Sequence, residues 1–340
     1  MSSGKERPAK GFYFGSTMRA RFYNHCFFWA LFIASFVPAS AKDLRLQAGK
    51  QKIILTVLRS DSVSCVIPFN RVGNLMVIKA KVDTMEGNFI LDTGAPHLVL
   101  NHTYFRDYPV DMEHDGQQTS IAGQGDYIYR TRVRELAFGA MQFFQLDADM
   151  TNLGNIENAK GLKVLGLLGL DLFRQCELII DFEKGLLYLH RIGKKEASTY
   201  SHQMLLDTSL YRTHAIGFAS KRLTATIEVA GKKLKLAIDC AAESNILDSR
   251  LPDAILSLVT INRRVKLAGP GDKKVDALFG NLATMKIGEQ AVENLPVIVI
   301  NLEFTCFNDG SGVSGVLGFD FLSQRKIGFN FVQRKMYIWK

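Results

Sequence analysis

The feature that most constrains the fold of this 340-residue chain is an internal duplication. Four segments of the first half recur in the second half, in the same order and at a nearly constant offset of 146 to 149 residues. The pairs are Phe89–Asp92 with Leu236–Asp239, Ile121–Asp126 with Leu267–Asp272, Leu167–Asp171 with Val316–Asp320, and Asp181–Tyr188 with Asn330–Tyr337. Such a repeat indicates two copies of one domain that fold in the same way.

Each copy has the pattern of a β-rich domain, because short apolar runs alternate with glycine-containing turns. The predicted strands are Leu75–Val82, Phe89–Leu91, Tyr127–Val133 and Leu186–Leu189 in the first copy, and Leu223–Val229, Leu234–Ile238, Leu295–Ile300 and Met336–Trp339 in the second. Helical signal is sparse. We therefore expect a mainly β protein with two homologous lobes, residues 71–195 and 196–340, preceded by strands within residues 42–70.

Residues 1–41 have the pattern of a cleaved signal peptide. Two arginines precede the apolar run Phe27–Val37, which is too short to span a bilayer, and an Ala-Ser-Ala sequence at 39–41 has the form of a signal-peptidase site. We expect a mature chain that begins near Lys42 and is secreted or periplasmic, with membrane contact only through this segment. The alternative is an uncleaved membrane anchor, and Met18 is an alternative start of translation.

The charge of the mature chain gives no reason to expect a nucleic-acid partner. Residues 1–41 hold five lysines and arginines and one glutamate, so their removal lowers the net charge from +9 to +5. Remaining basic clusters, such as those at 232–233 and 263–264, are short and lack interleaved aromatic residues. Four cysteines remain in the mature chain: Cys65, Cys176, Cys240 and Cys306. They allow three disulfide pairings, and the sequence does not choose among them. None has the spacing of a metal ligand.

The candidate catalytic motif is Asp92-Thr93-Gly94-Ala95, which lies between the apolar runs 89–91 and 98–100. An Asp-Thr-Gly sequence alone is common in turns. Here a glycine-rich segment follows about thirty residues later, and an apolar-apolar-Gly element follows that segment. In this arrangement the chain resembles the aspartic protease superfamily over residues 71–340. The resemblance implies two barrel-like lobes in a monomer with pseudo-two-fold symmetry, a peptide or protein substrate, and neither metal nor cofactor.

The resemblance also implies that Asp92 and Asp239 form a catalytic dyad. Two carboxylates held within hydrogen-bonding distance share one proton, because both cannot ionise cheaply at that separation, as in the aspartic proteases. One member can then accept a proton from water while the other donates to the peptide carbonyl. The resemblance further assigns to the Thr93 hydroxyl a hydrogen bond across to the opposing loop.

The second loop, Asp239-Cys240-Ala241-Ala242, departs from the family pattern because cysteine replaces threonine and alanine replaces glycine. A thiol is a weaker donor than a hydroxyl, so we expect the cross-loop bond from this side to be weakened or lost. Alanine is tolerated unless the backbone needs a positive φ. The Cys240 side chain is either buried and inert or a thiol whose oxidation would disturb the dyad.

The two Ala-Gly-x-Gly-Asp segments fall where the family places a mobile hairpin, or flap, over the substrate. Glycines allow the hinge and the close backbone approach that a flap requires, although a tight β-turn is the alternative. A flap in both copies resembles the symmetric retroviral enzymes more than the pepsin-like ones. We expect substrate to contact the two loops and the two flaps, at Thr93, Gly94, Ala95, Cys240, Ala241, Ala242, Gly123, Gly125, Gly269 and Gly271.

Three functional hypotheses follow from these motifs. The first is an endopeptidase that uses the Asp92 and Asp239 dyad. The second is a non-catalytic peptide-binding protein with the same cleft, which Cys240 and Ala241 motivate. In the third, first lobes from two chains pair with each other and the second lobe is a scaffold.

Overall fold

The computed structural model describes residues 64–120, 123–268, 274–303, 305, 307 and 310–340, together with two short antiparallel strands, β1 (Phe28–Trp29) and β2 (Phe32–Ile33). The predicted cleavage site, Cys306, Gly269 and Gly271 lie outside the described residues. In the described part, no helix has the length and apolar character needed to cross a membrane.

The first copy folds into a closed barrel. Its ring runs β5-β6-β11-β7-β10-β9, and pairing of β9 with β5 closes it. The strands are β5 (Leu75–Val82), β6 (Met85–Asp92), β7 (Leu98–Asn101), β9 (Gly123–Phe138), β10 (Met141–Thr151) and β11 (Gly166–Gly169). Outside the ring, β4 (Asn70–Val72) pairs with β5 and β8 (Asp111–Ser120) pairs with β9. The helical segments are α1 (His102–Phe105), α2 (Gly154–Lys160) and η1 (Leu170–Leu172).

The second copy repeats this barrel strand for strand. Its ring runs β15-β16-β21-β17-β20-β19 and is closed by pairing of β19 with β15. The strands are β15 (Arg222–Val229), β16 (Lys232–Ile238), β17 (Asn245–Asp248), β19 (Lys274–Ile287), β20 (Gln290–Ile300) and β21 (Val313–Leu317). β18 (Val259–Ala268) pairs with β19 outside the ring, and α3 (Asp253–Leu256) and α4 (Phe319–Leu322) take the places of α1 and η1. The predicted mainly β fold with two homologous barrel-like lobes is therefore confirmed.

The alternation of side chains along the strands explains why the barrels close around apolar cores. In β5, Ile78, Ala80 and Val82 are buried while Lys79 and Lys81 are exposed, which is the period of two expected of a strand with one face in the core. In the hairpin partner β6, Phe89 and Leu91 belong to the same core as these residues, whereas Ile90 is buried in a second apolar cluster. Burial of apolar surface is thus the main force that holds each lobe together.

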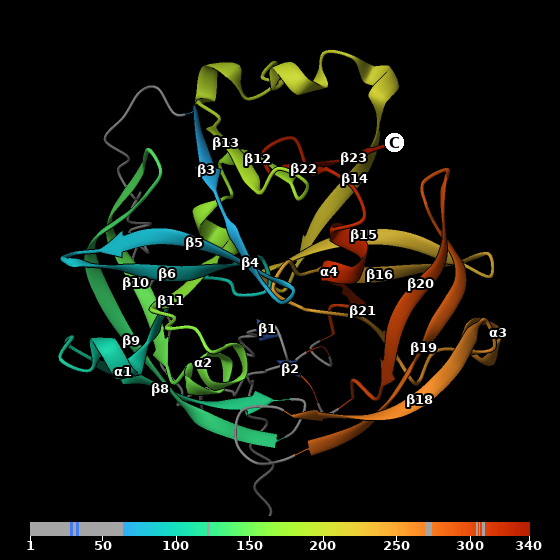
Figure 1. Ribbon diagram of the computed structural model, residues 1–340, viewed down its shortest axis with the longest axis horizontal. Coiled ribbons are helices and arrows are strands. Elements are labelled where there is room, and N and C mark those ends of the chain that lie inside the picture. The colour runs from blue at the N-terminus through green and yellow to red at the C-terminus, as the bar shows by residue number, and fades with distance from the viewer. Residues whose placement is uncertain are drawn as a thin grey trace, which may run out of the picture.

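A third sheet joins the lobes on one side of the molecule (Figure 1). Its order is β14-β23-β22-β12-β13-β3, from β14 (Tyr211–Ala219), β23 (Lys335–Trp339), β22 (Ile327–Asn330), β12 (Cys176–Asp181), β13 (Leu186–Arg191) and β3 (Ser64–Pro68). Two pseudo-symmetric polar pairs join the two copies here, one between β12 and β22 and one between β12 and the residue before β22. Asn330 Nδ2 donates to Glu177 Oε2 at 2.9 Å, and Lys326 Nζ lies 2.9 Å from Asp181 Oδ2. Strands of one copy therefore pair directly with strands of the other.

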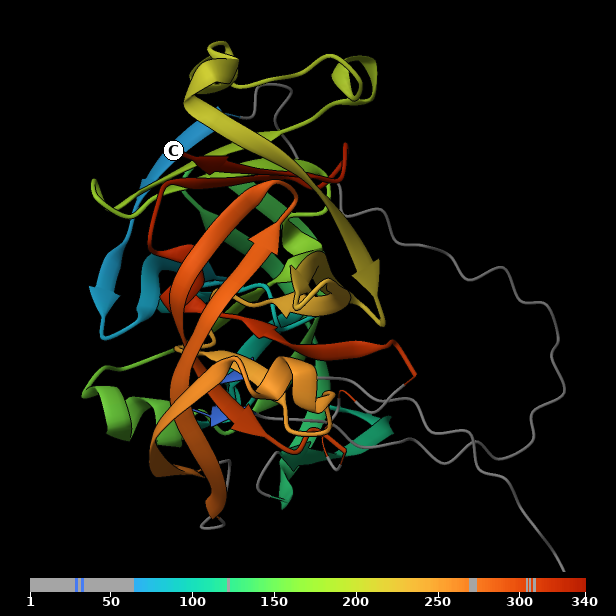
Figure 2. The same cartoon turned by 90° about the vertical axis from the view of Figure 1, so that its right-hand side faces the viewer.

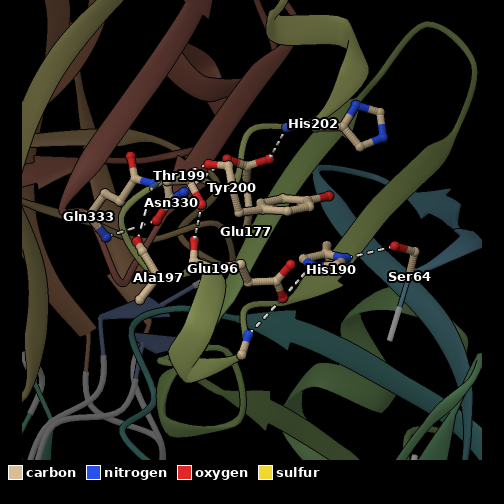
Figure 3. Close-up of polar contacts among 11 residues, drawn as sticks. Ser64, Glu177, His190, Glu196, Ala197, Thr199, Tyr200, His202, Asn330 and Gln333 are labelled. Carbon is tan, nitrogen blue, oxygen red and sulfur yellow. Dashed lines mark hydrogen bonds and ion pairs between the residues drawn. The ribbon is translucent and has the colours of Figure 1, made fainter. Parts of the chain in front are cut away.

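The connector between the copies contains η2 (Lys194–Glu196), η3 (Gln203–Leu205) and η4 (Thr208–Leu210) and crosses over the interlobe sheet (Figures 1 and 2). Side chains of both copies hold it (Figure 3). Gln333 Nε2 donates to the carbonyl oxygens of Ala197 at 3.3 Å and Tyr200 at 3.1 Å, and Glu177 Oε1 accepts from the backbone N–H of His202 at 3.1 Å. The connector thus fastens the two lobes in addition to linking them.

Candidate active site

Equivalent strand pairings place the two aspartate loops. Asp92 ends β6, which lies parallel to β11, while β7 on the far side of the loop runs antiparallel to β11. In the second copy, β21 is parallel to β16 and antiparallel to β17 in the same way. Each loop also forms a backbone hydrogen bond with the short helical segment that follows β11 or β21. Leu170 N donates to Ala95 O at 2.8 Å, and Phe319 N donates to Ala242 O at 2.7 Å.

Glycine is required where β11 and β21 end beneath the aspartate loops. A Cβ atom on Gly169 would lie 1.9 Å from the carbonyl oxygen of His97, and one on Gly318 would lie 2.5 Å from that of Ser244. Both obstacles are backbone atoms of the aspartate loops, so they cannot turn aside as a flexible side chain could. The apolar-Gly elements of the repeat are thus explained by close approach of backbone to backbone.

The two carboxyl groups are buried and equivalently bonded. Oδ1 of Asp92 accepts from the N–H groups of Gly94 at 2.8 Å and Ala95 at 3.0 Å, and Oδ1 of Asp239 accepts from those of Ala241 at 2.9 Å and Ala242 at 3.2 Å. Oδ2 of each is buried and meets no donor among the other described residues. The two carboxyl groups are close enough that each changes the pKa of the other. A hydrogen bond between two carboxyl groups requires that one of them holds a proton.

Burial and mutual repulsion favour retention of that proton. Burial raises the pKa of Asp92 well above its usual range, and the neighbouring charge of Asp239 raises it further against the lowering effect of the backbone N–H groups. Burial likewise raises the pKa of Asp239, to about 7, while the N–H groups of Ala241, Ala242 and Gly94 and the Asp92 carboxyl oppose the rise. The two carboxyl groups therefore titrate as a coupled pair that retains a proton at higher pH than an isolated aspartate would.

A reciprocal set of hydrogen bonds locks the loops together across the lobe boundary. Thr93 Oγ1 donates to Ile238 O at 3.1 Å and accepts from Cys240 N at 3.0 Å. In return, Cys240 Sγ donates to Leu91 O at 3.2 Å and accepts from Thr93 N at 3.3 Å. The expectation that the bond from the cysteine side would be weakened or lost is therefore corrected in part. The bond is present because Sγ occupies the position that Oγ1 has in the first loop, and only the weaker donor strength of a thiol remains.

The second departure, alanine for glycine, leaves the loop geometry unchanged. Neither Gly94 nor Ala241 is among the described residues with positive φ, so the position does not need glycine. What the loop needs there is the backbone N–H, and Ala241 supplies it to Asp239.

The environment of Cys240 favours the inert alternative for this thiol. The side chain is buried, and burial raises its pKa far above the usual range, with the Asp239 charge adding to the rise. A buried thiol with a raised pKa forms little thiolate, which is the reactive form. Of the cysteines in the described residues, Cys65, Cys176 and Cys240 are all free.

The flap segments form a hairpin in each copy. β8 pairs with β9, and β18 pairs with β19. Both hairpins reach toward the midline on the side opposite the interlobe sheet (Figure 1). Gly123 and Gly125 lie at the start of β9, whereas Gly269 and Gly271 lie outside the described residues.

An apolar cluster that the sequence did not reveal joins the two lobes around the loops. Its buried members include Ala95, Ala241 and Ala242 together with residues from both barrels. Partly buried side chains of the flap strands pack against it, namely Ile128, Val265, Leu267 and Val275. These flap side chains therefore belong to the same apolar cluster as the alanines of the two aspartate loops.

Comparisons with known proteins give a family match and similar solved structures. The Aspartyl protease family model matches residues 78–172 and 225–321, which contain the two loops and the glycines beneath them. Similar solved structures include an aspartic proteinase from Irpex lacteus, with 11% identity over 82% of this chain and 97% of that chain at a TM-score of 0.44. Basic 7S globulin from soybean has 10% identity over 82% of this chain and 94% of that chain at a TM-score of 0.40. No curated protein matches the sequence. Since the two family matches together cover more than half of the chain, the protein belongs to the aspartyl protease family.

Proposed function

We propose that the protein is an aspartic endopeptidase that hydrolyses peptide bonds with a water molecule activated by Asp92 and Asp239. The observation that carries the proposal is the arrangement of the two buried carboxyl groups. Each is fixed through Oδ1 by two backbone N–H groups, which leaves both Oδ2 atoms for the shared proton and for water. This is the chemistry that general acid–base hydrolysis of an amide requires.

In the proposed reaction, the ionised member of the pair takes a proton from water as its oxygen attacks the carbonyl carbon of the scissile bond. The protonated member donates its proton to the carbonyl oxygen, which gives a neutral tetrahedral diol. One carboxyl group then transfers its proton to the nitrogen while the other takes a proton from a hydroxyl of the diol, so that breakage of the C–N bond releases an amine and a carboxylic acid. The sum is one water consumed for one peptide bond broken, and the carboxyl pair ends with one proton, as it began.

The lobes and hairpins support an extended peptide as the substrate. An extended chain fits a site built from two related lobes, because it can contact both sides along its length. The apolar cluster around the loops, with Ile128 from one hairpin and Val265 from the other, favours apolar side chains next to the scissile bond. Both carboxyl groups come from one chain, which supports a monomeric enzyme over pairing of first lobes between chains.

A non-catalytic peptide-binding protein is the alternative from a different functional class. The replacement of threonine by Cys240 and of glycine by Ala241 is the sequence feature that suggests it. Their hydrogen bonds match those of Thr93 and Gly94 in the first loop, so they no longer favour it.

Hydrolysis of an unfolded protein substrate, from acidic to neutral pH, tests the proposal. Asp92→Asn and Asp239→Asn should each abolish turnover while the protein stays folded, because an amide matches a carboxyl in shape but cannot exchange the proton. Asp147→Asn is a matched control, since that side chain is 55% exposed and forms a surface ion pair with Arg132. Undiminished hydrolysis by Asp92→Asn would end the dyad hypothesis. Turnover by Asp239→Asn that rises with the square of protein concentration would instead support pairing between chains.

We further propose that the enzyme acts outside the cytoplasm after removal of residues 1–41. The apolar run 27–37 and the Ala-Ser-Ala sequence at 39–41 support this placement. N-terminal sequencing of the exported protein should give a start near Lys42. A chain from the medium or periplasm that still carries residues 18–41 would contradict it.

A further inference from the structure

Glu243 directly follows the second aspartate loop and is held from the opposite lobe at two points. Its Oε1 lies 2.5 Å from Lys160 Nζ, and the two side chains are only 19% and 10% exposed. Its backbone carbonyl oxygen accepts a hydrogen bond from Asn74 Nδ2 at 3.2 Å. Lys160 ends α2 and Asn74 lies in the turn between β4 and β5, so both contacts come from the first lobe. The loop that carries Asp239 is therefore anchored outside its own barrel.

The two anchoring residues, Lys160 and Asn74, lie next to each other. A Cβ atom on Gly73 would lie 2.7 Å from Lys160 Nζ, so the ammonium group packs directly against the turn that carries Asn74. Gly73 has a φ of +62°, which favours glycine and keeps this space open. The position of Lys160 at the carboxyl end of a helix is also favourable for a positive charge.

The first loop has a different support at the same point. Pro96 stands where the second loop has Glu243, four residues after the aspartate in each case. Proline restricts φ and so stiffens the first loop by itself. Its carbonyl oxygen accepts from Asp171 N at 3.0 Å within the same lobe. The second loop lacks that proline and has a thiol in its cross-loop bonds, so it has fewer restraints of its own.

We propose that Glu243 is a positioning residue: Lys160 and Asn74 hold it from the first lobe, and this contact keeps Asp239 at the place where its carboxyl group meets Asp92. The catalytic consequence rests on the proposed peptidase function, whereas the positioning does not. The pair is mostly buried, so loss of one partner would leave an uncompensated charge. Burial raises the pKa of Glu243 and the charge of Asp320 adds to the rise, while Lys160 opposes it and so favours the ionised carboxylate.

The test separates positioning from simple stability with three variants. Lys160→Met and Glu243→Gln each leave one buried charge without its partner and should lower the melting temperature. The double variant Lys160→Met/Glu243→Gln removes both charges, so its melting temperature should return toward that of the wild type. The restraint on the loop is still missing, and kcat should remain about ten- to a hundredfold below the wild type, because small misplacements of a catalytic group have effects of this size. KM should change less than twofold.

A second readout does not depend on hydrolysis. If the loop is released, the carboxyl groups separate and the dyad should lose its proton at lower pH than in the wild type. NMR of the aspartate carboxyl carbons during a pH titration measures this in the double variant. Asn74→Ala should shift the titration in the same direction by a smaller amount. Arg132→Met/Asp147→Asn, which removes an exposed ion pair, is the matched control and should change neither readout.

The outcomes are distinct. A wild type that hydrolyses no peptide would reject the proposed function, and the titration would still decide the role of Glu243. A double variant with wild-type kcat and a wild-type titration would overturn the positioning role. Activity that falls only in proportion to the loss of folded protein in each variant would also overturn it.

Discussion

The sulfur of Cys240 offers the sharpest test of how the two aspartate loops hold each other. Cys240→Ala removes the atom that donates to Leu91 O and accepts from Thr93 N, and it does so at a buried position. Cys240→Thr replaces the thiol with the hydroxyl that the first loop already has. Because Thr93 occupies the equivalent position in the other loop, the pseudo-symmetric site has the shape to accept a threonine.

The magnitudes follow from the number of bonds. A buried polar group left without a partner costs about 1–3 kcal/mol, and Cys240→Ala leaves two such groups, Leu91 O and Thr93 N. Sulfur bonds are weak, so we expect a loss of about 2–4 kcal/mol. Cys240→Thr should stabilise the protein by about 0.5–1.5 kcal/mol, the net value of one neutral hydrogen bond.

Thermal unfolding at constant pH measures both effects. A change of 1 kcal/mol shifts the melting temperature by about 2–4 °C for domains of this size. Cys240→Ala should therefore melt well below the wild type and Cys240→Thr slightly above it. Thr93→Ala should cost at least as much as Cys240→Ala, because a hydroxyl makes the stronger bonds. A Cys240→Ala variant as stable as the wild type would refute the reasoning, because it would mean that Sγ contributes no hydrogen bond.

Three further predictions follow. Gly169→Ala should prevent folding of the first lobe, because its Cβ atom would collide with His97 O. Gly161→Ala is the comparison: Gly161 has a φ of +61° and open space around it, so this variant should lose only about 1 kcal/mol of stability. Melting temperatures measure the difference between the two variants. Asp239→Asn should gain stability relative to the wild type as pH rises from about 4 to 7, by at most about 1.4 kcal/mol per pH unit in urea unfolding. The raised pKa of Asp239 means that the folded wild type binds more protons than the unfolded chain in this pH range, so the stability of the wild type falls as pH rises. If the stabilities of the two proteins changed in parallel with pH, the prediction would be wrong. The Cys240 thiol, whose pKa burial raises, should resist iodoacetamide in the native protein and react after unfolding, as mass spectrometry can detect.

The strands and the duplication could be predicted because both leave local marks in the sequence. The predicted strand Leu75–Val82 coincides with β5, and Leu223–Val229 differs from β15 by one residue at its start. In both, the alternation of apolar and polar residues reports which face meets the core. The repeat then places Asp239 opposite Asp92 without any knowledge of the strand pairing.

Ring closure and the interlobe sheet could not be predicted in the same way. They depend on pairings between distant residues, such as Glu177 of β12 with Asn330 of β22. An apolar strand has the same pattern whether its partner is the next strand or one from the other copy. Only the packing of the whole chain decides which edges meet.

The sequence identified the residue types of the site but not their contacts. Cysteine in place of threonine indicated a weaker bond, yet whether that bond survives depends on the position of Leu91 O, which no local pattern reports. Glu243 in place of Pro96 was visible as a difference between the copies. Its partner Lys160 lies in another lobe and belongs to a helix that the sequence did not indicate.

The two aspartate loops differ in the contacts that support them. The first loop is supported from within its own lobe, through Pro96 and the bond from Asp171 N to its carbonyl. The second loop has an additional anchor from the first lobe, through Lys160 at Glu243, whereas the bonds between Thr93 and Cys240 support both loops. Duplication makes the two loops similar, but it does not require that they be supported equally. One loop can therefore lose threonine and glycine and still present its carboxyl group, provided that the lobes stay packed together. In this protein the interlobe contacts consequently reach the two aspartate loops as well as holding the lobes together.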